Sequence, residues 1–126
     1  MAGDEAGIRN HRDLIAWQKA VRLVTMIYQL SGSFPKEELY GLTSQMRRAA
    51  VSIPANIAGG QGRRKSGEFL QFLSIARGSL YELDTHLEIA MELRYLANES
   101  PDFRQVCEQM REVARLLNGL IKSLES

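Results

Sequence analysis

The sequence predicts an all-α protein that folds as an antiparallel up-down four-helix bundle. Three observations carry this prediction. Apolar residues recur at intervals of three and four along four segments, Gly- and Pro-containing stretches separate these segments, and no stretch alternates between apolar and polar residues as a strand does. With 126 residues, of which 44% are hydrophobic, the chain fits one domain with a core that needs no disulfides.

The first helix is expected to begin near Asp13, a residue type that caps helix N-termini, and to end before Gly32 and Pro35. Its apolar positions follow spacings of three and four: Leu14, Trp17, Val21, Val24 and Tyr28. Residues 1–12 are polar and lack the apolar core of a signal peptide. We interpret them as a disordered lead-in to one bundle domain over residues 13–126.

The second helix is expected to begin near Gly41 and contains Pro54. Inside a helix this proline removes an amide and crowds the carbonyl group of Ala50, at a cost of about 3 kcal/mol or more unless the helix bends. Ser52 and Asn56 flank the proline, and their side chains can satisfy the freed backbone groups. The pattern therefore favours a helix kinked at Pro54 over a helix that ends there.

The third helix is expected to run from Ser66, as the N-cap, to about Leu96, with Glu68 in the first turn, where the helix dipole favours an anion. The fourth begins with Ser100 as the N-cap and Pro101 at the first helical position. Its apolar residues alternate strictly between spacings of three and four, as in a coiled coil: Phe103, Val106, Met110, Val113, Leu117, Leu120 and Leu124.

The helices carry more apolar and small residues than one inward-facing stripe requires. These surplus residues are Ile15, Leu23, Met26, Ala50, Ala55, Ala58, Ile75, Ile89, Leu93 and Leu96. Exposed apolar patches of this extent mark interfaces in soluble proteins. We therefore expect a homo-oligomer.

The charges are unevenly distributed, although the net charge is only +1 and no global field attracts nucleic acid or a membrane surface. Residues 41–79 contain six cationic side chains and one acidic one, whereas residues 80–99 contain one cationic and five acidic ones. The basic block can form a binding face. It can equally pair with the acidic block, within one subunit or between subunits.

Five cations are candidates for binding nucleic acid: Arg47, Arg48, Arg63, Arg64 and Lys65. The last three precede the N-terminus of the third helix, where free amides attract anions such as an RNA or DNA phosphate. An exposed loop whose charges serve solubility explains them equally well. Adjacent residues on a helix point about 100° apart, so Arg47 and Arg48 cannot share a face. One of them is expected to pair with an acidic residue.

The glycines Gly59, Gly60 and Gly62 do not form a nucleotide-binding motif. A P-loop requires glycine immediately before its Lys-Ser pair, and in this sequence arginine occupies that position. The final glycine of a dinucleotide-binding fingerprint is also missing, and no strand is expected before either motif. We interpret the three glycines as the end of the second helix and the turn that follows it.

No catalytic, cofactor-binding or metal-binding residue is assigned, and an enzyme is not expected. His11, His86 and Cys107 are scattered without metal-ligand spacing, and no Glu-x-x-His motif of a metal-binding bundle is present. Glu82 and His86 are interpreted as a surface pair. A single cysteine suits a reducing cytoplasm, and no apolar run reaches membrane-spanning length, so no membrane partner is expected.

Four stretches closely resemble the four-helix-bundle proteins encoded in intervening sequences of bacterial 23S rRNA genes. They are "LIAWQKAVRL", "YGLTSQMRRAAVSIPANIAGGQGR", "EFLQFLSIARGSLYELDTHL" and "LRYL", and the resemblance covers roughly residues 13–96. The matching motif of the second helix comprises Gln45, Arg47, Arg48, Ala49, Ser52, Ile53, Pro54, Asn56, Ile57, Ala58, Gly60, Gly62 and Arg63. Gly59 departs from the family, which commonly has an acidic residue there.

The resemblance implies an antiparallel four-helix bundle that assembles as a ring-like homopentamer. A more distant resemblance is to the accessory variability protein of diversity-generating retroelements, a pentameric bundle that binds nucleic acid and a reverse transcriptase. The resemblance implies a largely uncharacterised role, for which RNA binding is the usual suggestion. We expect a non-enzymatic assembly that binds RNA or DNA through Arg47, Arg48, Arg63, Arg64 and Lys65. The alternative is a scaffold for a protein partner, in which these cations pair with Glu82, Glu88 and Glu92 across subunit interfaces.

Overall fold

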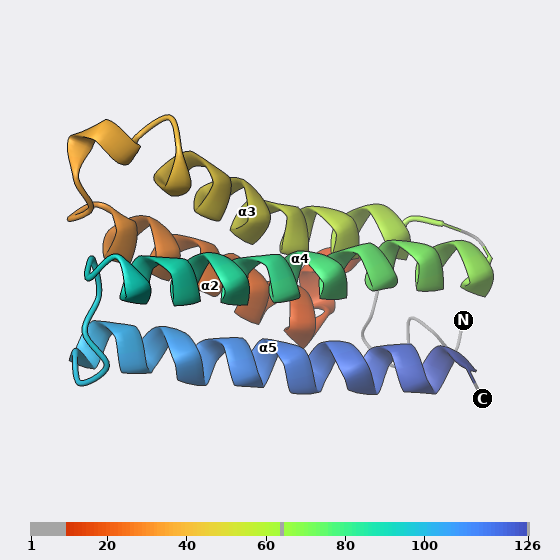
Figure 1. Cartoon of the computed structure of the whole chain (residues 1–126). Helices are drawn as coiled ribbons and strands as arrows, with labels where there is room; N and C mark the ends of the chain where they lie inside the picture. The colour runs from red at the N-terminus through yellow and green to blue at the C-terminus, as the bar shows by residue number, and fades with distance from the viewer. Residues whose placement is uncertain (1–9, 64, 126) are drawn as a thin grey trace.

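The computed structural model describes residues 10–63 and 65–125, which form four long helices running alternately up and down (Figure 1). The four helices are α2 (Ile15–Ser31), α3 (Leu42–Gln61), α4 (Ser66–Glu92) and α5 (Pro101–Glu125). Two short 3-10 turns accompany them, η1 (His11–Asp13) and η2 (Lys36–Glu38). The described residues contain no strand, so the all-α prediction is confirmed.

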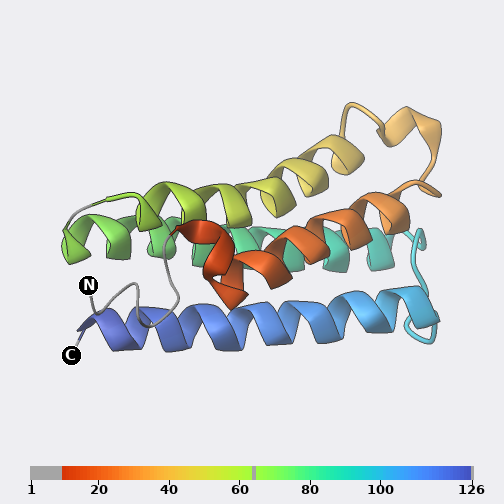
Figure 2. The same cartoon turned by 180° about the vertical axis from the view of Figure 1, so that it is seen from behind.

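The four helices pack as a ring of neighbours. Helix α2 contacts α3 and α5, and α4 contacts the same two helices, with the most extensive contact between α3 and α4. Figures 1 and 2, which view the molecule from opposite sides, show α3 and α4 lying next to each other and α5 on the far side of the bundle from α3. Any site formed jointly by two helices is therefore to be sought first along α3 and α4.

The start of α2 differs from the sequence-based prediction. Asn10 and Asp13 form a capping box around η1: the Asn10 side chain accepts from the Arg12 amide at 2.8 Å, and Asp13 Oδ2 accepts from the Asn10 amide at 3.4 Å. Helix α2 begins two residues later, after Leu14. Asp13 therefore stabilises the preceding turn and is not the N-cap of α2. Of the expected lead-in, residues 1–9 lie outside the described residues.

Helix α3 begins at Leu42, as expected, and continues without interruption through Pro54. The alternative that the helix ends at this proline is therefore excluded. The Asn56 side-chain amide donates to the Ser52 carbonyl oxygen at 2.8 Å, which is the kind of local bond expected beside a proline. Pro54 itself is buried.

Helix α4 is shorter than predicted, because it ends at Glu92 and not near Leu96. Arg94 has a φ of 65°, and the amides of Arg94 and Tyr95 donate to the carbonyl groups of Met91 and Ala90 at 2.9 and 2.8 Å. This pattern is a Schellman motif, in which a left-handed residue satisfies the last carbonyl groups of a helix. Glycine usually occupies that position. Because arginine stands there instead, the sequence contains no local pattern that indicates the end of the helix.

The other ends of α4 and α5 lie close to their predicted positions. Ser66 is the first residue of α4, with Lys65 in the N-cap position, so the predicted cap is wrong by one residue. Helix α5 begins at Pro101, and Ser100 Oγ accepts from the Phe103 amide at 3.4 Å, which confirms Ser100 as the cap.

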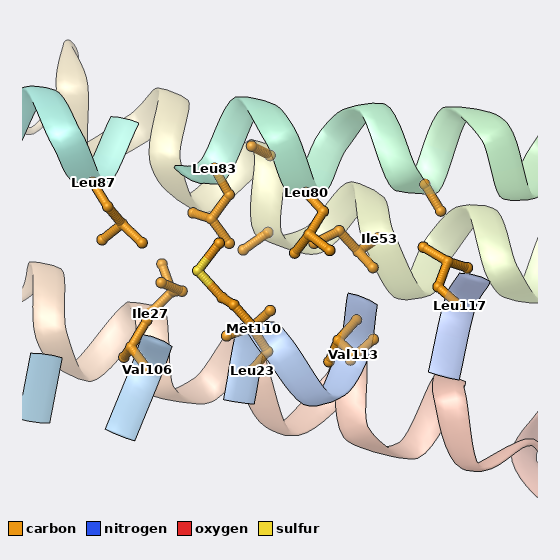
Figure 3. Close-up of a cluster of buried hydrophobic side chains, with 14 of the residues drawn as sticks. Leu23, Ile27, Ile53, Leu80, Leu83, Leu87, Val106, Met110, Val113 and Leu117 are labelled. Carbon is orange, nitrogen blue, oxygen red and sulfur yellow. The ribbon is translucent and has the colours of Figure 1, made fainter. Parts of the chain in front are cut away.

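The core between the four helices consists mainly of aliphatic side chains, with Met46, Met110, Phe34 and Phe103 among them, and Figure 3 shows part of it. The residues labelled there are Leu23, Ile27, Ile53, Leu80, Leu83, Leu87, Val106, Met110, Val113 and Leu117. All of them are buried, and they come from all four helices. The α5 seam predicted from spacing faces this core from Phe103 to Leu117, whereas beyond it Ile121 is buried and the predicted Leu120 and Leu124 are half-buried. Leu23, interpreted as surplus, is a core residue with no exposed surface.

One end of the bundle is tied together by Tyr95. Its hydroxyl donates to Glu38 Oε2 at 2.8 Å, and its ring lies 5.5 Å from that of Phe34. The other oxygen of Glu38 accepts from the Leu42 amide at 3.2 Å. Because these contacts join the α2–α3 connection to the α4–α5 connection, they set the relative positions of α3 and α4 at this end.

Candidate nucleic-acid interface

The Arg47 side chain is engaged within the chain. Its Nε donates to Ser31 Oγ at 2.9 Å and its Nη2 to the Tyr28 carbonyl oxygen at 3.3 Å. The guanidinium carbon lies 4.5 Å from the centre of the Tyr28 ring, within the range of a cation–π contact. Arg47 thus joins α3 to α2, and its partners are a hydroxyl, a carbonyl and a ring instead of a carboxylate.

Arg48, one residue later, is exposed and has no carboxylate partner within the described ranges. The two adjacent arginines therefore lie on different faces of α3, as helical geometry requires. Arg48 faces the side on which α3 meets α4.

Arg63 and Lys65 form what we call the basic corner, at the turn between α3 and α4. Both side chains are exposed, and the Arg63 guanidinium carbon lies 4.8 Å from the centre of the Phe72 ring. Lys65 occupies the N-cap position of α4 without a side-chain cap, so amides of the first turn remain available to an anion. Arg64 lies outside the described residues. Across residues 10–63 and 65–125, the ion pair found joins Arg115 to Glu112 on α5, so no carboxylate of these described residues neutralises either cation of the corner.

The candidate cations do not gather at one point. With a rise of about 1.5 Å per residue along a helix, Arg48 lies about 20 Å from the basic corner. The structure thus divides the four described candidates into Arg47, which packs on α2, Arg48, which lies beside α4, and the corner residues Arg63 and Lys65. The sequence could not distinguish these places, because each depends on which helix lies next to α3.

A polar hollow lies between α3 and α4, around Arg48. Its lining residues, which define the polar hollow from here on, are Gln45, Arg48, Ala49 and Ser52 from α3 and Glu82 and His86 from α4. Arg48 and Glu82 carry opposite charges and line the same hollow, yet they form no ion pair with each other. Both charges are therefore available to a group that enters between them.

The floor of the polar hollow is held by hydrogen bonds between the two helices. Ser52 Oγ accepts from Asn56 Nδ2 at 2.9 Å and from Ser79 Oγ at 2.8 Å. With both lone pairs engaged, the Ser52 hydroxyl retains a proton to donate. Ser79 is buried, so this contact fixes α3 against α4 directly below the hollow.

His86 forms one wall of the polar hollow. Its Nδ1 is buried without a hydrogen-bond partner in the part of the chain that the structure describes. Burial lowers the pKa of His86 below its usual value of 6.5, and the nearby Glu82 carboxylate opposes this shift only partly. We assign the proton of the neutral ring to Nε2, because a buried N–H without an acceptor is rarer than a buried lone pair. Arg48, Ser52 and His86 then supply donors to the polar hollow, Glu82 supplies a charged acceptor, and the Gln45 amide can do either.

Sequence reasoning missed this hollow. Glu82 and His86 were interpreted as a surface pair four residues apart, and their spacing does place them on one face of α4. No local sequence pattern indicates that Arg48, on another helix, lies opposite Glu82 and His86. This proximity depends on the register of α3 against α4.

A second groove, between α4 and α5, is mainly apolar and includes Leu80, Tyr81, Cys107, Met110 and Ala114. Burial raises the pKa of the Cys107 thiol, with Arg111 acting in the opposite direction. A thiol of this kind is mostly protonated near neutral pH and is a poor nucleophile. The groove therefore has the character of a packing surface.

Two further searches covered the described part of the chain. No three His, Cys, Asp or Glu side chains lie close enough together to hold a metal ion. No helix there combines the length and apolar character that crossing a bilayer requires.

The fold and surface define a small all-α bundle protein that presents exposed cations, without an ion-pair partner among the described residues, where one long helix begins. A family model described as 23S rRNA-intervening sequence protein matches residues 12–119, and the chain belongs to this family. A search of curated proteins returned no match. The resemblance noted in the sequence is thus confirmed for this family, whereas the more distant likeness to the retroelement accessory protein stays a prediction.

Proposed function

We propose that the protein is a non-enzymatic, cytoplasmic bundle that assembles as a homopentameric ring and binds RNA or DNA through Arg48, Arg63, Arg64 and Lys65. The observation that carries the proposal is the basic corner, where Arg63 and Lys65 are exposed beside uncapped amides of α4 and without a carboxylate partner in the described residues. Phosphate groups are the ligands that such a corner attracts. Arg47, engaged with α2, supports the fold in this proposal.

Assembly is supported by the apolar groove between α4 and α5. Tyr81 is 65% exposed at its edge, Ala114 is half-buried in it, and the buried core residues Leu80 and Met110 form its floor. An exposed aromatic residue beside an apolar groove is typical of a protein interface. A ring would repeat the basic corner in every subunit, so a chain with a net charge of +1 would present a multivalent cationic surface.

We further propose that Pro54 bends α3, because its ring and missing amide disturb the turn that begins at Ala50. Residual dipolar couplings of the amides before and after Pro54 test this directly. Two distinct helix axes support a kink, and one common axis contradicts it.

The first experiment is an electrophoretic mobility shift with single-stranded and structured RNA and DNA across a salt series, on protein whose mass is known from light scattering. Binding is expected to weaken steeply as salt rises, because bound counterions are released. The variant Arg63→Ala/Arg64→Ala/Lys65→Ala should lose binding while keeping its mass. A matched control, Lys19→Ala/Arg104→Ala/Lys122→Ala, removes three cations elsewhere and should retain most of it.

The competing function is a protein scaffold, which the apolar α4–α5 groove favours. In that case the corner cations pair with Glu82, Glu88 and Glu92 of neighbouring subunits or with a protein partner. An intact oligomer that binds no nucleic acid even at low salt would contradict our proposal and support the scaffold.

A further inference from the structure

We propose that the polar hollow binds an unpaired guanine base of the nucleic acid that the basic corner holds. This inference rests on the proposed function and deepens it. It assigns the recognition of a base to a surface that lies apart from the phosphate-binding residues. The observation behind it is that two opposite charges, Arg48 and Glu82, line one hollow without forming an ion pair.

The arrangement of these charges is the first step. Arg48 comes from α3 and Glu82 from α4, so a guanidinium group with several N–H donors and a carboxylate line the hollow from two different helices. Each would gain a charge-assisted partner if a planar group with both acceptors and donors entered between them. A phosphate satisfies Arg48 alone and is repelled by Glu82, so the hollow suits a base better than the backbone of a nucleic acid.

Guanine matches this pair better than the other bases. Its O6 and N7 are two adjacent acceptors, which arginine contacts with both arms of its fork. Its N1–H and N2 amino group are two adjacent donors on the neighbouring edge, and a carboxylate can accept from both. Adenine and cytosine offer one amino group beside ring acceptors, and uracil offers one N–H between two carbonyl groups, so none of them satisfies both charges with two bonds each.

The remaining walls supply further contacts of the same kind. Ser52 has a proton to donate because its lone pairs are occupied by Asn56 and Ser79. His86 presents Nε2–H and an imidazole ring on which a base can stack. Val51 and Ile89, each 42% exposed, lie one helical turn from Arg48 and His86 and provide apolar surface at the rim.

The base must be unpaired, because the N1–H and N2 amino group that Glu82 would bind lie on the edge that pairs with cytosine in a duplex. The distance to the basic corner, about 20 Å along α3, is one that a short single-stranded segment can span. Phosphates at the corner would then position the strand, and the polar hollow would read one base of it.

The test uses short single-stranded oligouridine RNAs that contain one central guanine, inosine, 7-deazaguanine or adenine, with affinities measured by fluorescence anisotropy. Inosine lacks the N2 amino group that Glu82 accepts from, and 7-deazaguanine lacks the N7 that Arg48 donates to. Each loss is expected to weaken binding by about five- to a hundredfold, the range of one bidentate base contact.

The variants make the assignment specific. Glu82→Gln should abolish the preference for guanine over inosine. Arg48→Ala should abolish the preference for guanine over 7-deazaguanine. Matched controls, Glu88→Gln and Arg104→Ala, remove the same charges from exposed positions outside the hollow and should leave both preferences intact. Arg63→Ala/Lys65→Ala should weaken the binding of all the oligonucleotides to the same extent.

The outcomes separate this inference from the function on which it rests. If the protein binds the four oligonucleotides with equal affinity, the guanine site is overturned. If Arg63→Ala/Lys65→Ala also abolishes this binding, the proposed nucleic-acid function is retained. A lower mass by light scattering for Arg48→Ala or Glu82→Gln also overturns the guanine site, because the hollow would then hold a second copy of the chain. No binding of any oligonucleotide overturns both.

Discussion

At the scale of single residues, His86 shows how burial controls protonation in this bundle. Its ring is held between α3 and α4, with Arg48 and Glu82 as the charged groups that face it. Protonation would place a second N–H at the buried Nδ1, where the described residues offer no acceptor. Burial is the main cause of the lowered pKa of His86, and the Glu82 carboxylate, which raises this pKa, only partly opposes the shift.

This shift predicts a specific pH dependence of stability. Above the unfolded value of 6.5, His86 is neutral in both states and contributes no dependence. As the pH falls below 6.5, the unfolded chain binds a proton more readily than the folded one, so the free energy of unfolding decreases until the pH passes the lower folded pKa. Urea titrations between about pH 7.5 and about pH 5.5 should show a smaller decrease for His86→Gln, and equal slopes would contradict the prediction.

Gly60 determines how closely α3 approaches α4. A Cβ atom at this position would lie 2.7 Å from Phe69 Cδ1 and 2.7 Å from Phe72 Cβ, and the latter atom moves only with the backbone. Gly60→Ala should therefore lower the free energy of unfolding by about 1–3 kcal/mol.

The control for this substitution is Gly78→Ala, within α4. A Cβ there meets nothing within 4 Å, so alanine should raise stability by up to about 1 kcal/mol through its higher helix propensity. Urea denaturation of both variants measures these changes in the free energy of unfolding. A stabilising or neutral Gly60→Ala would contradict the prediction, because it would show that the two helices can move apart at little cost.

At the scale of helices, Arg47 joins α3 to α2 through two hydrogen bonds and the ring of Tyr28. Arg47→Ala should lower the free energy of unfolding by about 1–3 kcal/mol, since it removes these contacts and leaves Ser31 without one partner. The neighbouring substitution Arg48→Ala should change it by no more than about 0.5 kcal/mol, because that side chain is exposed. Thermal melts of the two variants test the division of roles, and equal losses would contradict it.

The ends of the helices show where local sequence signals fail. Ser100 and Pro101 combine a capping side chain with a suitable first residue, and α5 begins there. Helix α4 ends at a left-handed Arg94, a residue type that gives no such signal. The chain turns there while Tyr95 bonds to Glu38 and packs on Phe34, contacts with a segment more than fifty residues away in the sequence.

At the scale of the whole molecule, the exposed Tyr81 and the apolar α4–α5 groove form the surface on which we expect subunits to meet. Tyr81→Asp should lower the mass in solution, because it replaces the exposed aromatic ring with a carboxylate that would lose its hydration at the interface. Gln71→Glu, which adds the same charge at an exposed position of α4 away from the groove, should leave it unchanged.

Light scattering measures both masses, and circular dichroism confirms that each variant remains helical. An unchanged mass for Tyr81→Asp would place the subunit contact elsewhere on the bundle. A monomeric parent protein would contradict the proposed assembly altogether.

The sequence by itself determined the four helices, most of their ends and most of the inward faces of α3, α4 and α5, because the periodicity of apolar residues is a local property of a helix. The inward face predicted for α2 is wrong: its buried apolar residues are Ala16, Ala20, Leu23, Ile27 and Leu30, whereas Tyr28 of the predicted stripe is 43% exposed. The sequence also determined that Arg47 and Arg48 diverge, since adjacent residues on a helix point in different directions. The tertiary structure decided which of the two faces α2 and which faces α4. It also decided that Arg48, Glu82 and His86 share one hollow, because the register of α3 against α4 depends on the close approach at Gly60 and on the bond between Ser52 and Ser79. These contacts join residues distant in the sequence, and no periodicity within either helix encodes them.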